Sequence, residues 1–195
     1  MAESNGVPTI MAERLVLLVT GALSAATVPI AAAWLRQTYP ELRVRIVLTR
    51  TAERFVTRAA LSPISGTDVL LDVWPDEPVR HALHAELNEW ADTFVVYPAT
   101  MAFIARFALG QCDSPVLLAL QCTRAPVAVA PSLPPGAVDS VAYRQHLAGL
   151  ESRDNVTVVA PTPAFSTTTG RNDAAAAASL PEVLVWAEKV RARLS

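Results

Sequence analysis

The sequence predicts an α/β fold built on a doubly wound, mostly parallel sheet with helices on both faces. Two observations carry this prediction. Short, continuous apolar runs recur along the 195-residue chain, and strands of a parallel sheet have this composition because both of their faces are buried. Segments with helix-start and helix-stop signals separate these runs, and such alternation is typical of parallel βαβ units. We therefore expect a Rossmann-like, or flavodoxin-like, architecture.

The first strand and helix show the pattern most clearly. Leu15–Val19 is an apolar run that ends at the turn residue Gly21. Ser24 can cap the helix that continues through Leu35, and Pro40 closes it. The other predicted strands are 44–48, 69–72, 93–97, 116–120, 127–130 and 156–159. The other predicted helices are 52–61, the segment opened by His84, 101–109, 138–150 and 180–194.

Length and composition set the expected organisation. A chain of 195 residues can bury one full α/β core, so we expect a single domain over 14–195 behind a disordered N-terminal tail, 1–13. Charged residues make up only 17% and hydrophobic residues 52%, which indicates apolar surface buried between subunits. A homo-oligomer is therefore the expected state.

The charge and the cysteines argue against several classes of function. The formal net charge is −2, without a run of basic residues, so nucleic acid is not an expected partner. Cys112 and Cys122 match no zinc spacing and make no disulfide framework, which favours a reduced, cytoplasmic setting without a metal site. The apolar run Leu15–Thr20 is too short to span a bilayer and lacks a basic leader, so neither a membrane partner nor a signal peptide is expected.

Three loops that follow predicted strands are rich in small and hydroxyl side chains. The carboxyl ends of parallel strands form the ligand-binding edge of such sheets, so we expect these loops to meet. Each hydroxyl alone is an ordinary helix cap, but the three loops together favour a phosphorylated ligand held by backbone N–H groups. Neither GxGxxG nor GxxxxGK[ST] occurs, which argues against NAD and ATP. The candidate residues are Gly21, Ala22, Ser24, Thr49, Thr51, Pro98, Ala99 and Thr100.

A block in the middle of the chain carries a family resemblance. His84–Asp92 reads HAELNEWAD, Pro98–Thr100 reads PAT, and Gly110–Asp113 reads GQCD. Their order and spacing resemble the homo-oligomeric flavin-containing cysteine decarboxylases, which include phosphopantothenoylcysteine decarboxylase and the lantibiotic-type peptidyl cysteine decarboxylases. The likeness runs from about Arg14 to the C-terminus. It implies FMN, or less often FAD, held between the subunits of a homo-trimer or a homo-dodecamer.

The resemblance also implies roles for individual residues. His84 would be the catalytic base, whereas a lone histidine at a helix start would otherwise be a cap or a solvated residue. Pro98–Thr100 would form a flavin loop, and Asp113 would lie close to the flavin, although alone it could cap a turn. Oxidation of a cysteine side chain by a flavin requires a base that makes the thiolate and places Cβ against flavin N5. The resulting thioaldehyde is an electron sink that lets CO₂ leave.

Two motifs depart from the family pattern. Members usually carry Pro-Ala-Ser-Ala-Asn-Thr, but Ala102 stands where the Asn would be. They also carry Pro-x-Met-Asn-x-x-Met, whose Asn binds the substrate carboxylate, and here Leu133 and Pro134 replace Met and Asn. Proline has neither a side-chain donor nor a backbone N–H, so Pro134 cannot replace that Asn. Either another group holds the carboxylate or the substrate differs.

A third motif distinguishes the subfamilies. Phe165–Arg171 reads FSTTTGR and resembles the substrate clamp of the peptidyl cysteine decarboxylases, within a loop near 160–178. Phe165, Gly170 and Arg171 are the candidate substrate contacts; a guanidinium binds carboxylate bidentately, although Arg171 could equally be a surface charge. Phosphopantothenoylcysteine decarboxylases place a cysteine acid in this region, and no cysteine follows Cys122. This absence favours a reaction that stops at an enethiol.

The primary hypothesis is FMN-dependent oxidative decarboxylation of the C-terminal cysteine of a ribosomally synthesised precursor peptide. The product would be the enethiol for an aminovinyl-cysteine ring, as in lantibiotic biosynthesis. One alternative is phosphopantothenoylcysteine decarboxylase of coenzyme A biosynthesis. Another is a flavin-binding regulatory subunit that has lost catalysis, which Ala102 and Pro134 suggest. A flavin prenyltransferase agrees with the fold alone.

Overall fold

The computed structural model describes residues 7–195 and contains a six-stranded sheet in the order β3-β2-β1-β4-β5-β6. Every pair of neighbouring strands is parallel. The strands are β1 (Arg14–Val19), β2 (Arg43–Leu48), β3 (Val69–Leu71), β4 (Thr93–Ala99), β5 (Val127–Pro131) and β6 (Val156–Val158). The predicted doubly wound α/β fold is confirmed. The strand order reverses between β1 and β4, and ligands of such sheets bind beyond the carboxyl ends of the strands at that point.

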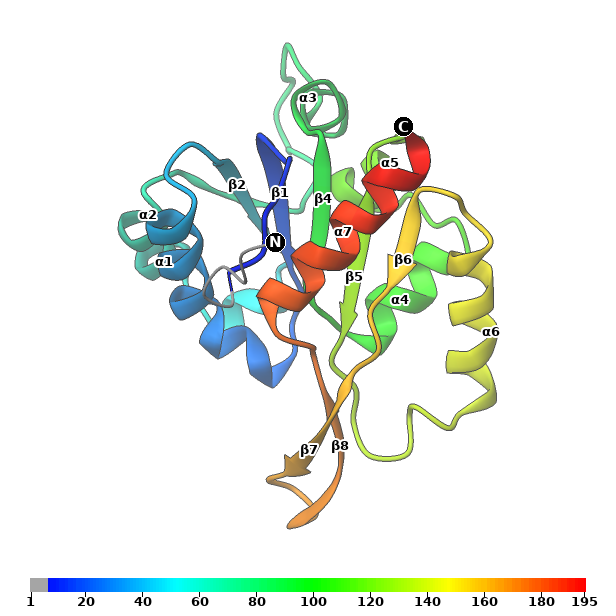
Figure 1. The fold of residues 1–195 in the computed structure, drawn as a ribbon. Helices are drawn as coiled ribbons and strands as arrows, with labels where there is room; N and C mark the ends of the chain where they lie inside the picture. The colour runs from blue at the N-terminus through cyan, green and yellow to red at the C-terminus, as the bar shows by residue number, and fades with distance from the viewer. Residues whose placement is uncertain (1–6) are drawn as a thin grey trace, which may run out of the picture.

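Helices cover both faces of the sheet, and a small hairpin extends away from it (Figure 1). The helices are α1 (Val28–Thr38), α2 (Arg58–Ser65), α3 (Leu83–Trp90), α4 (Met101–Ala108), α5 (Pro115–Cys122), α6 (Val141–Glu151) and α7 (Leu180–Leu194), with short 3₁₀ helices η1 (Leu23–Thr27) and η2 (Ala52–Arg54). The hairpin pairs β7 (Thr162–Ser166) with β8 (Arg171–Ala176) in antiparallel fashion. Its residues lie in the segment expected to form a clamp loop.

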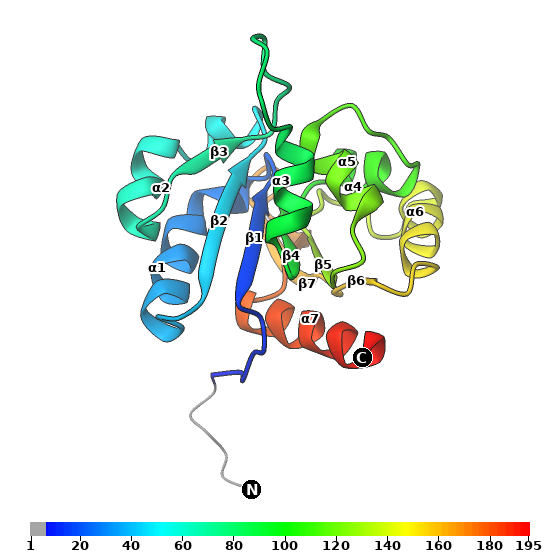
Figure 2. The ribbon, with the colours of Figure 1, turned by 90° about the horizontal axis from the view of Figure 1, so that it is seen from above.

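The residues of β1 show how two cores form on one sheet. Successive side chains of a strand point to opposite faces. Leu15 and Leu17 pack in a cluster with residues of α1, α2 and α7. Val16 and Leu18 pack in a second cluster with residues of α3, α4, α5 and α6. Figure 2, viewed from above, shows α7 on the side of the sheet opposite α3, α4 and α5. The continuous apolar run is therefore explained by burial on both faces.

The segment 116–120 was predicted as a strand, and this prediction is wrong because the segment belongs to helix α5. An apolar run of this length does not distinguish a buried strand from a buried helix. The helix is set by its start: Pro115 occupies the first turn, and the Ser114 hydroxyl accepts a hydrogen bond from the backbone N–H of Leu117. The Asp72 carboxylate, distant in sequence, accepts the N–H of Val116 at 2.9 Å.

Two other local predictions need correction. The helix expected at 52–61 is split into η2 and α2, because the Thr57 side chain accepts a hydrogen bond from the N–H of Ala60 and starts α2 there. Ser24 does not cap a helix: its hydroxyl donates to Ser132 Oγ at 3.0 Å. It lies inside η1, and α1 starts later, with Pro29 in its first turn.

The expected tail, 1–13, lies partly outside the described residues, since these begin at 7. Its later part contacts the domain. The Tyr39 hydroxyl donates to the carbonyl of Pro8 at 2.6 Å, and the N–H of Ala12 donates to Glu188 Oε1 at 3.1 Å. Among the described helices, none has the length and apolar character that a membrane crossing requires.

Candidate functional site

The loops after β1 and β4 are joined by one buried hydroxyl. Thr20, only 1% exposed, donates from its N–H and from Oγ1 to the carbonyl of Pro98, at 3.2 and 2.7 Å. The same Oγ1 accepts the N–H of Thr100 at 2.8 Å. The N–H of Ser132, at the end of β5, donates to the carbonyl of Ala99 at 2.8 Å. These bonds fix the backbone at the point where the strand order reverses.

The loop after β2 packs against the same point through Gly21. A Cβ on Gly21 would lie 2.6 Å from Thr51 Cβ and 2.8 Å from the Thr51 carbonyl carbon, so no larger residue fits without movement. The hydroxyls of Thr49 and Thr51 are 3.1 Å apart, and Thr49 Oγ1 accepts the N–H of Ala52 at 3.3 Å. The three strand-end loops predicted to meet therefore do meet.

A cavity of about 700 Å³ opens beside these loops. Its polar part includes the Ser24 and Ser132 hydroxyls, which are bonded to each other at 3.0 Å, and Thr100, whose hydroxyl also caps α4. Its wall is mostly apolar. Its lining includes Gly21, Ala22, Ser24, Thr100, Met101, Ser132, Leu133, Pro134 and Phe165. Four predicted cofactor residues and one predicted substrate residue thus share one cavity.

A second hollow of about 370 Å³ holds the other hydroxyl-bearing candidates. Thr49, Thr51 and Asp113 line it together with Arg50 and Arg106. Arg106 Nη2 lies 2.6 Å from Asp113 Oδ1, which partly neutralises the pair. Gly21 lines the larger cavity and Thr51 lines the second hollow. Because these two residues pack against each other, the two hollows are neighbours, separated by this contact.

Asp72 is a buried carboxylate at the edge of the second hollow. Its side chain accepts hydrogen bonds from Ser114 Oγ at 2.7 Å and from the N–H of Val116 at 2.9 Å. Burial raises the pKa of Asp72, and these two hydrogen bonds oppose that rise. Each carboxylate oxygen accepts one of these two bonds, and both donors belong to the start of α5, so the carboxylate orients that helix. We assign it a structural role.

His84 lies in the first turn of α3, outside both hollows as the described residues define them. Its ring packs against Trp74 in an edge-to-face arrangement, with centroids 5.7 Å apart. Trp74 Nε1 in turn donates to the carbonyl of Asp113 at 3.1 Å. His84 Nδ1 is buried and has no hydrogen-bond partner among the described residues. The candidate base is therefore not brought to the cavity of its own chain.

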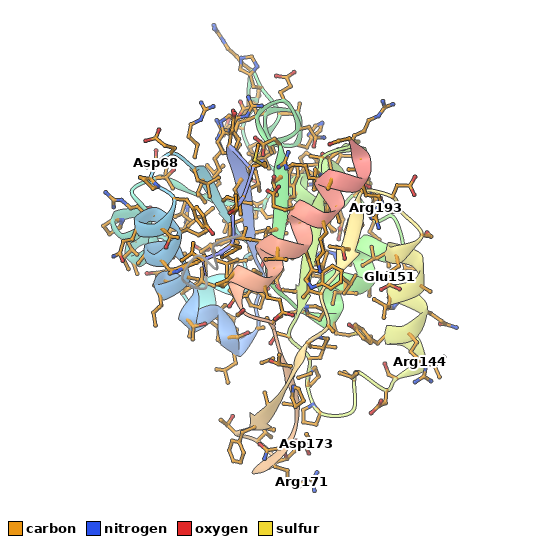
Figure 3. All side chains as sticks on the ribbon, in the orientation of Figure 1. Asp68, Arg144, Glu151, Arg171, Asp173 and Arg193 are labelled. Atoms are coloured by element: carbon orange, nitrogen blue, oxygen red, sulfur yellow. The ribbon has the colours of Figure 1, made fainter. Side chains whose placement is uncertain are left out.

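The predicted substrate contacts separate along the hairpin. Phe165, 61% exposed, lines the cavity. Gly170 has φ +68° in the turn between β7 and β8. Arg171 pairs with Asp173, at 3.0 Å between Nε and Oδ2, and Figure 3 shows both side chains at the far end of the hairpin. In this conformation the described residues Gly170 and Arg171 do not line the cavity.

Sequence reasoning assigned Pro98 and Ala99 to the ligand and overlooked Thr20 and Ser132. Pro98 and Ala99 are buried and act through their carbonyls, as described above. Thr20 had a usable signal, because a hydroxyl at the end of an apolar strand needs a partner. Trp74, the partner of the His84 ring, follows the predicted strand 69–72 and carried no signal.

The residues present fit a flavin nucleotide. The close approach at Gly21 leaves no Cβ over the loop, so the Gly21 backbone is open to an anion, whereas the N–H of Ala22 donates to the Thr20 carbonyl at 2.9 Å and shapes the turn. Hydroxyls of Ser24, Thr49, Thr51 and Thr100 are donors suited to a phosphate and a sugar alcohol. The apolar wall suits a planar ring system.

Comparison with known proteins also indicates a flavin-binding protein, and the matches extend over most of the chain. The sequence profile described as Flavoprotein matches residues 8–190. A cypemycin cysteine dehydrogenase (decarboxylating) of Streptomyces sp is 35% identical over 173 residues, which cover 89% of each chain. The coenzyme A biosynthesis bifunctional protein CoaBC of Escherichia coli K12 is 34% identical over 72% of this chain, but the match spans only 34% of that protein.

Solved structures agree with these matches. The crystal structure of the cypemycin decarboxylase superposes with a TM-score of 0.79 at 31% identity, over 95% of this chain and 97% of that one. An FMN-dependent cysteine decarboxylase from thioviridamide biosynthesis superposes with a TM-score of 0.68 at 26% identity, over 92% and 98%. The similarity therefore includes the sheet, the helices and the hairpin region.

Proposed function

Because this chain belongs to the flavoprotein family, as the resemblance of the His84 block implied, we propose that it is an FMN-dependent peptidyl cysteine decarboxylase. Its substrate is the C-terminal cysteine of a ribosomally synthesised precursor peptide, and its product is the enethiol for an aminovinyl-cysteine ring. One observation carries the proposal: the 35% identity to a cypemycin cysteine dehydrogenase (decarboxylating) extends over 89% of both chains. The match to CoaBC covers only part of a longer, bifunctional protein.

Cofactor binding is assigned to the strand-end loops. The hydroxyls of Ser24, Thr49, Thr51 and Thr100 and the open backbone at Gly21 would hold FMN, with Ala22 lining the cavity beside them, while Pro98 and Ala99 keep the loops in place through their carbonyls. Asp113 lies beside Thr49 and Thr51. When bound, the flavin supplies a hydride acceptor for the cysteine side chain.

The remaining steps fall to the chain's own residues. His84 takes the proton of the substrate thiol, and Phe165 covers the peptide in the cavity. The oxidised cysteine accepts the electron pair left when CO₂ departs from Cα. No cysteine follows Cys122, so the chain supplies no acid of the kind that reprotonates the enethiol in coenzyme A biosynthesis. Because Pro134 offers no donor, the carboxylate contact is open to the Ser132 hydroxyl, which accepts from Ser24 and keeps its own O–H free in the cavity.

The separation of His84 from the cavity supports a homo-oligomer. We propose that His84 of one subunit faces the cavity of the next, in a trimer or a dodecamer. Leu23, which lines the cavity from η1, and Ile30, in the first turn of α1, are 65% and 74% exposed, as expected of apolar contacts between subunits. We assign the protein to the cytoplasm, where its flavin and precursor peptide would be available.

The test is incubation of the purified, FMN-loaded protein with peptides that end in cysteine, including peptides encoded near its gene. We expect a mass loss of one CO₂ and two hydrogens. Peptides ending in serine or in cysteine amide are the controls, since they lack the thiol or the carboxylate. Failure on every cysteine-ended peptide would refute the proposal. Turnover of phosphopantothenoylcysteine instead would support the coenzyme A alternative, and flavin binding without any turnover would support a regulatory subunit.

A further inference from the structure

We propose that Asn88 is a positioning residue for His84. Its side-chain carbonyl accepts a hydrogen bond from His84 Nδ1–H and thereby leaves Nε2 as the basic nitrogen. The inference rests on the proposed function, in which His84 is the base, and it assigns Asn88 a part in setting the protonation of that base.

The first observation is a pair of buried atoms without partners. In residues 7–195, four buried side-chain nitrogen or oxygen atoms lack a hydrogen bond: Arg14 Nε, His84 Nδ1, Asn88 Oδ1 and Arg191 Nε. The two arginine nitrogens lie near carboxylates, at 3.7 Å from Asp92 and 3.2 Å from Glu188. Neither His84 Nδ1 nor Asn88 Oδ1 forms a hydrogen bond or an ion pair with any of the described residues.

The second observation is their placement on one face of α3. His84 and Asn88 are four residues apart, and side chains at this spacing are neighbours on a helix. Leu87, fully buried between them, anchors that side of the helix in the core. Each side chain ends in a torsion with a broad energy well. The proposed bond requires these two torsions to turn the buried atoms, His84 Nδ1 and Asn88 Oδ1, towards each other.

The chemistry of the two atoms is complementary. An amide oxygen only accepts hydrogen bonds, whereas a neutral imidazole has one N–H donor and one acceptor nitrogen. A buried acceptor that finds no donor is costly. Oδ1, and not the Nδ2 donor, is the buried amide atom of Asn88 without a partner, so the tautomer that carries its proton on Nδ1 satisfies it, and the other tautomer would place two acceptors against each other. Asn88 therefore selects the Nδ1–H tautomer.

The same arrangement fixes the direction of the ring. Trp74 packs edge-to-face against His84, and its own Nε1–H is held by the carbonyl of Asp113. When Trp74 packs against the ring and Asn88 accepts the hydrogen bond from Nδ1, the Nε2 atom of His84 is directed away from the core. Of the two ring nitrogens, only Nδ1 is buried without a partner. Nε2 is thus the nitrogen available to take a thiol proton from a peptide.

The experiment is nitrogen NMR of the flavin-loaded protein labelled with ¹⁵N-histidine, recorded where His84 is neutral. His84→Asn assigns the signal among the three histidines. We expect the chemical shifts of a protonated Nδ1 and an unprotonated Nε2. Asn88→Ala should shift the population towards Nε2–H, and Asn88→Asp, which retains an acceptor, should restore Nδ1–H. Glu89→Ala, an exposed neighbour on the same helix, is the matched control and should leave the tautomer unchanged.

Activity provides an independent readout. Asn88→Ala should lower kcat about tenfold with KM little changed, a fraction of what a general base contributes, and Asn88→Asp should recover part of the loss. An Nε2–H tautomer in the unsubstituted protein, or an unaltered tautomer in Asn88→Ala, overturns the inference. If the tautomer behaves as expected but no peptide is decarboxylated, the hydrogen bond stands and the proposed function fails. The measurement on the unsubstituted protein decides the matter even if Asn88→Ala does not fold.

Discussion

Gly21 and Thr51 pack so closely that a Cβ on Gly21 would lie 2.6 Å from Thr51 Cβ and 2.8 Å from its carbonyl carbon. Real Cβ atoms do not approach other heavy atoms so closely, so a side chain at position 21 must displace the Thr51 backbone. Since this contact joins the loops after β1 and β2 between the two hollows, its displacement would affect both.

The first prediction concerns Gly21→Ala. We expect a loss of stability of about 1–3 kcal/mol, as for other overpacked sites, and at least a tenfold weaker binding of FMN because the loop moves. Thermal unfolding and flavin fluorescence titration measure the two effects. Gly149→Ala, within helix α6, is the control, because the nearest atom to its Cβ would be the Ala108 carbonyl oxygen at 3.9 Å. There alanine should increase the free energy of unfolding by about 0.5–1 kcal/mol. Unchanged flavin affinity in Gly21→Ala would contradict the placement of the cofactor.

The second prediction concerns His84→Asn. If His84 is the base, turnover should fall by about 10²–10⁴-fold, while the flavin spectrum and the melting temperature stay close to those of the parent. A substituted protein that loses its flavin would indicate a structural role for His84 instead.

The position of His84 outside the cavity of its own chain adds a sharper test. His84→Asn and Gly21→Val should each be inactive, but refolding them together should give mixed oligomers more active than either. In such oligomers an intact His84 can meet an intact cavity of a neighbour. No recovery in verified mixed oligomers would argue against a site shared between subunits.

The sequence predicted the structure correctly where a local pattern, or the general geometry of a parallel sheet, determines it. The apolar run of β1 predicts a strand buried on both faces, and both cores confirm it. The loops at Gly21, Thr49 and Thr100 were predicted to meet because parallel strands place their carboxyl ends together, and Thr20 and Gly21 show how they do so.

The other predictions failed where the local signal was overlooked or where distant residues contribute. Ser114 and Pro115 start helix α5, but the apolar run 116–120 after them does not distinguish a helix from a strand, and Asp72, which accepts the N–H of Val116, lies 44 residues away. The hairpin β7–β8 has little alternation of apolar residues and is stabilised partly by the bridge between Leu133 and Ala175. The separation of His84 from the cavity likewise depends on how α3 packs, although His84 and Thr100 are near in sequence.

The third prediction concerns the pH dependence of stability through Asp72. Burial raises the pKa of this carboxyl in the folded state above its ordinary value of 3.8. The folded protein therefore binds the proton more tightly than the unfolded chain. This contribution to stability is fully present below the ordinary pKa and is lost as the pH rises through the raised one.

Asp72→Asn removes the titration and can keep both contacts, since its amide accepts from Val116 and donates to Ser114 Oγ. We expect its free energy of unfolding, relative to the parent, to increase as the pH rises from about 4 towards neutrality, in urea unfolding series. Asp72→Ala leaves the Val116 N–H unpaired and should cost about 1–3 kcal/mol. A stability difference between Asp72→Asn and the parent that does not change with pH would contradict the raised pKa.

The fourth prediction concerns Phe165, which lines the cavity from the hairpin although 61% of it is exposed. The hairpin is tied to the cavity wall: the N–H of Leu133 donates to the carbonyl of Ala175 at 2.8 Å, and the N–H of Ala175 donates back at 3.1 Å. Phe165 thus has a fixed support and a free face. An aromatic ring in this position gains burial only when a peptide occupies the cavity.

Truncation should therefore affect the substrate and leave the fold intact. We expect Phe165→Ala to change stability by less than about 0.5 kcal/mol and to retain its flavin. It should raise KM for a cysteine-ended peptide about tenfold at nearly constant kcat, because burying such a side chain contributes about 1.5–3 kcal/mol. Leu109→Ala, equally exposed at 65% but at the end of α4, is the control and should leave KM unchanged. If both substitutions leave KM unchanged, the hairpin does not hold the peptide. A fall in kcat for Phe165→Ala without a change in KM would instead place its contact in the transition state.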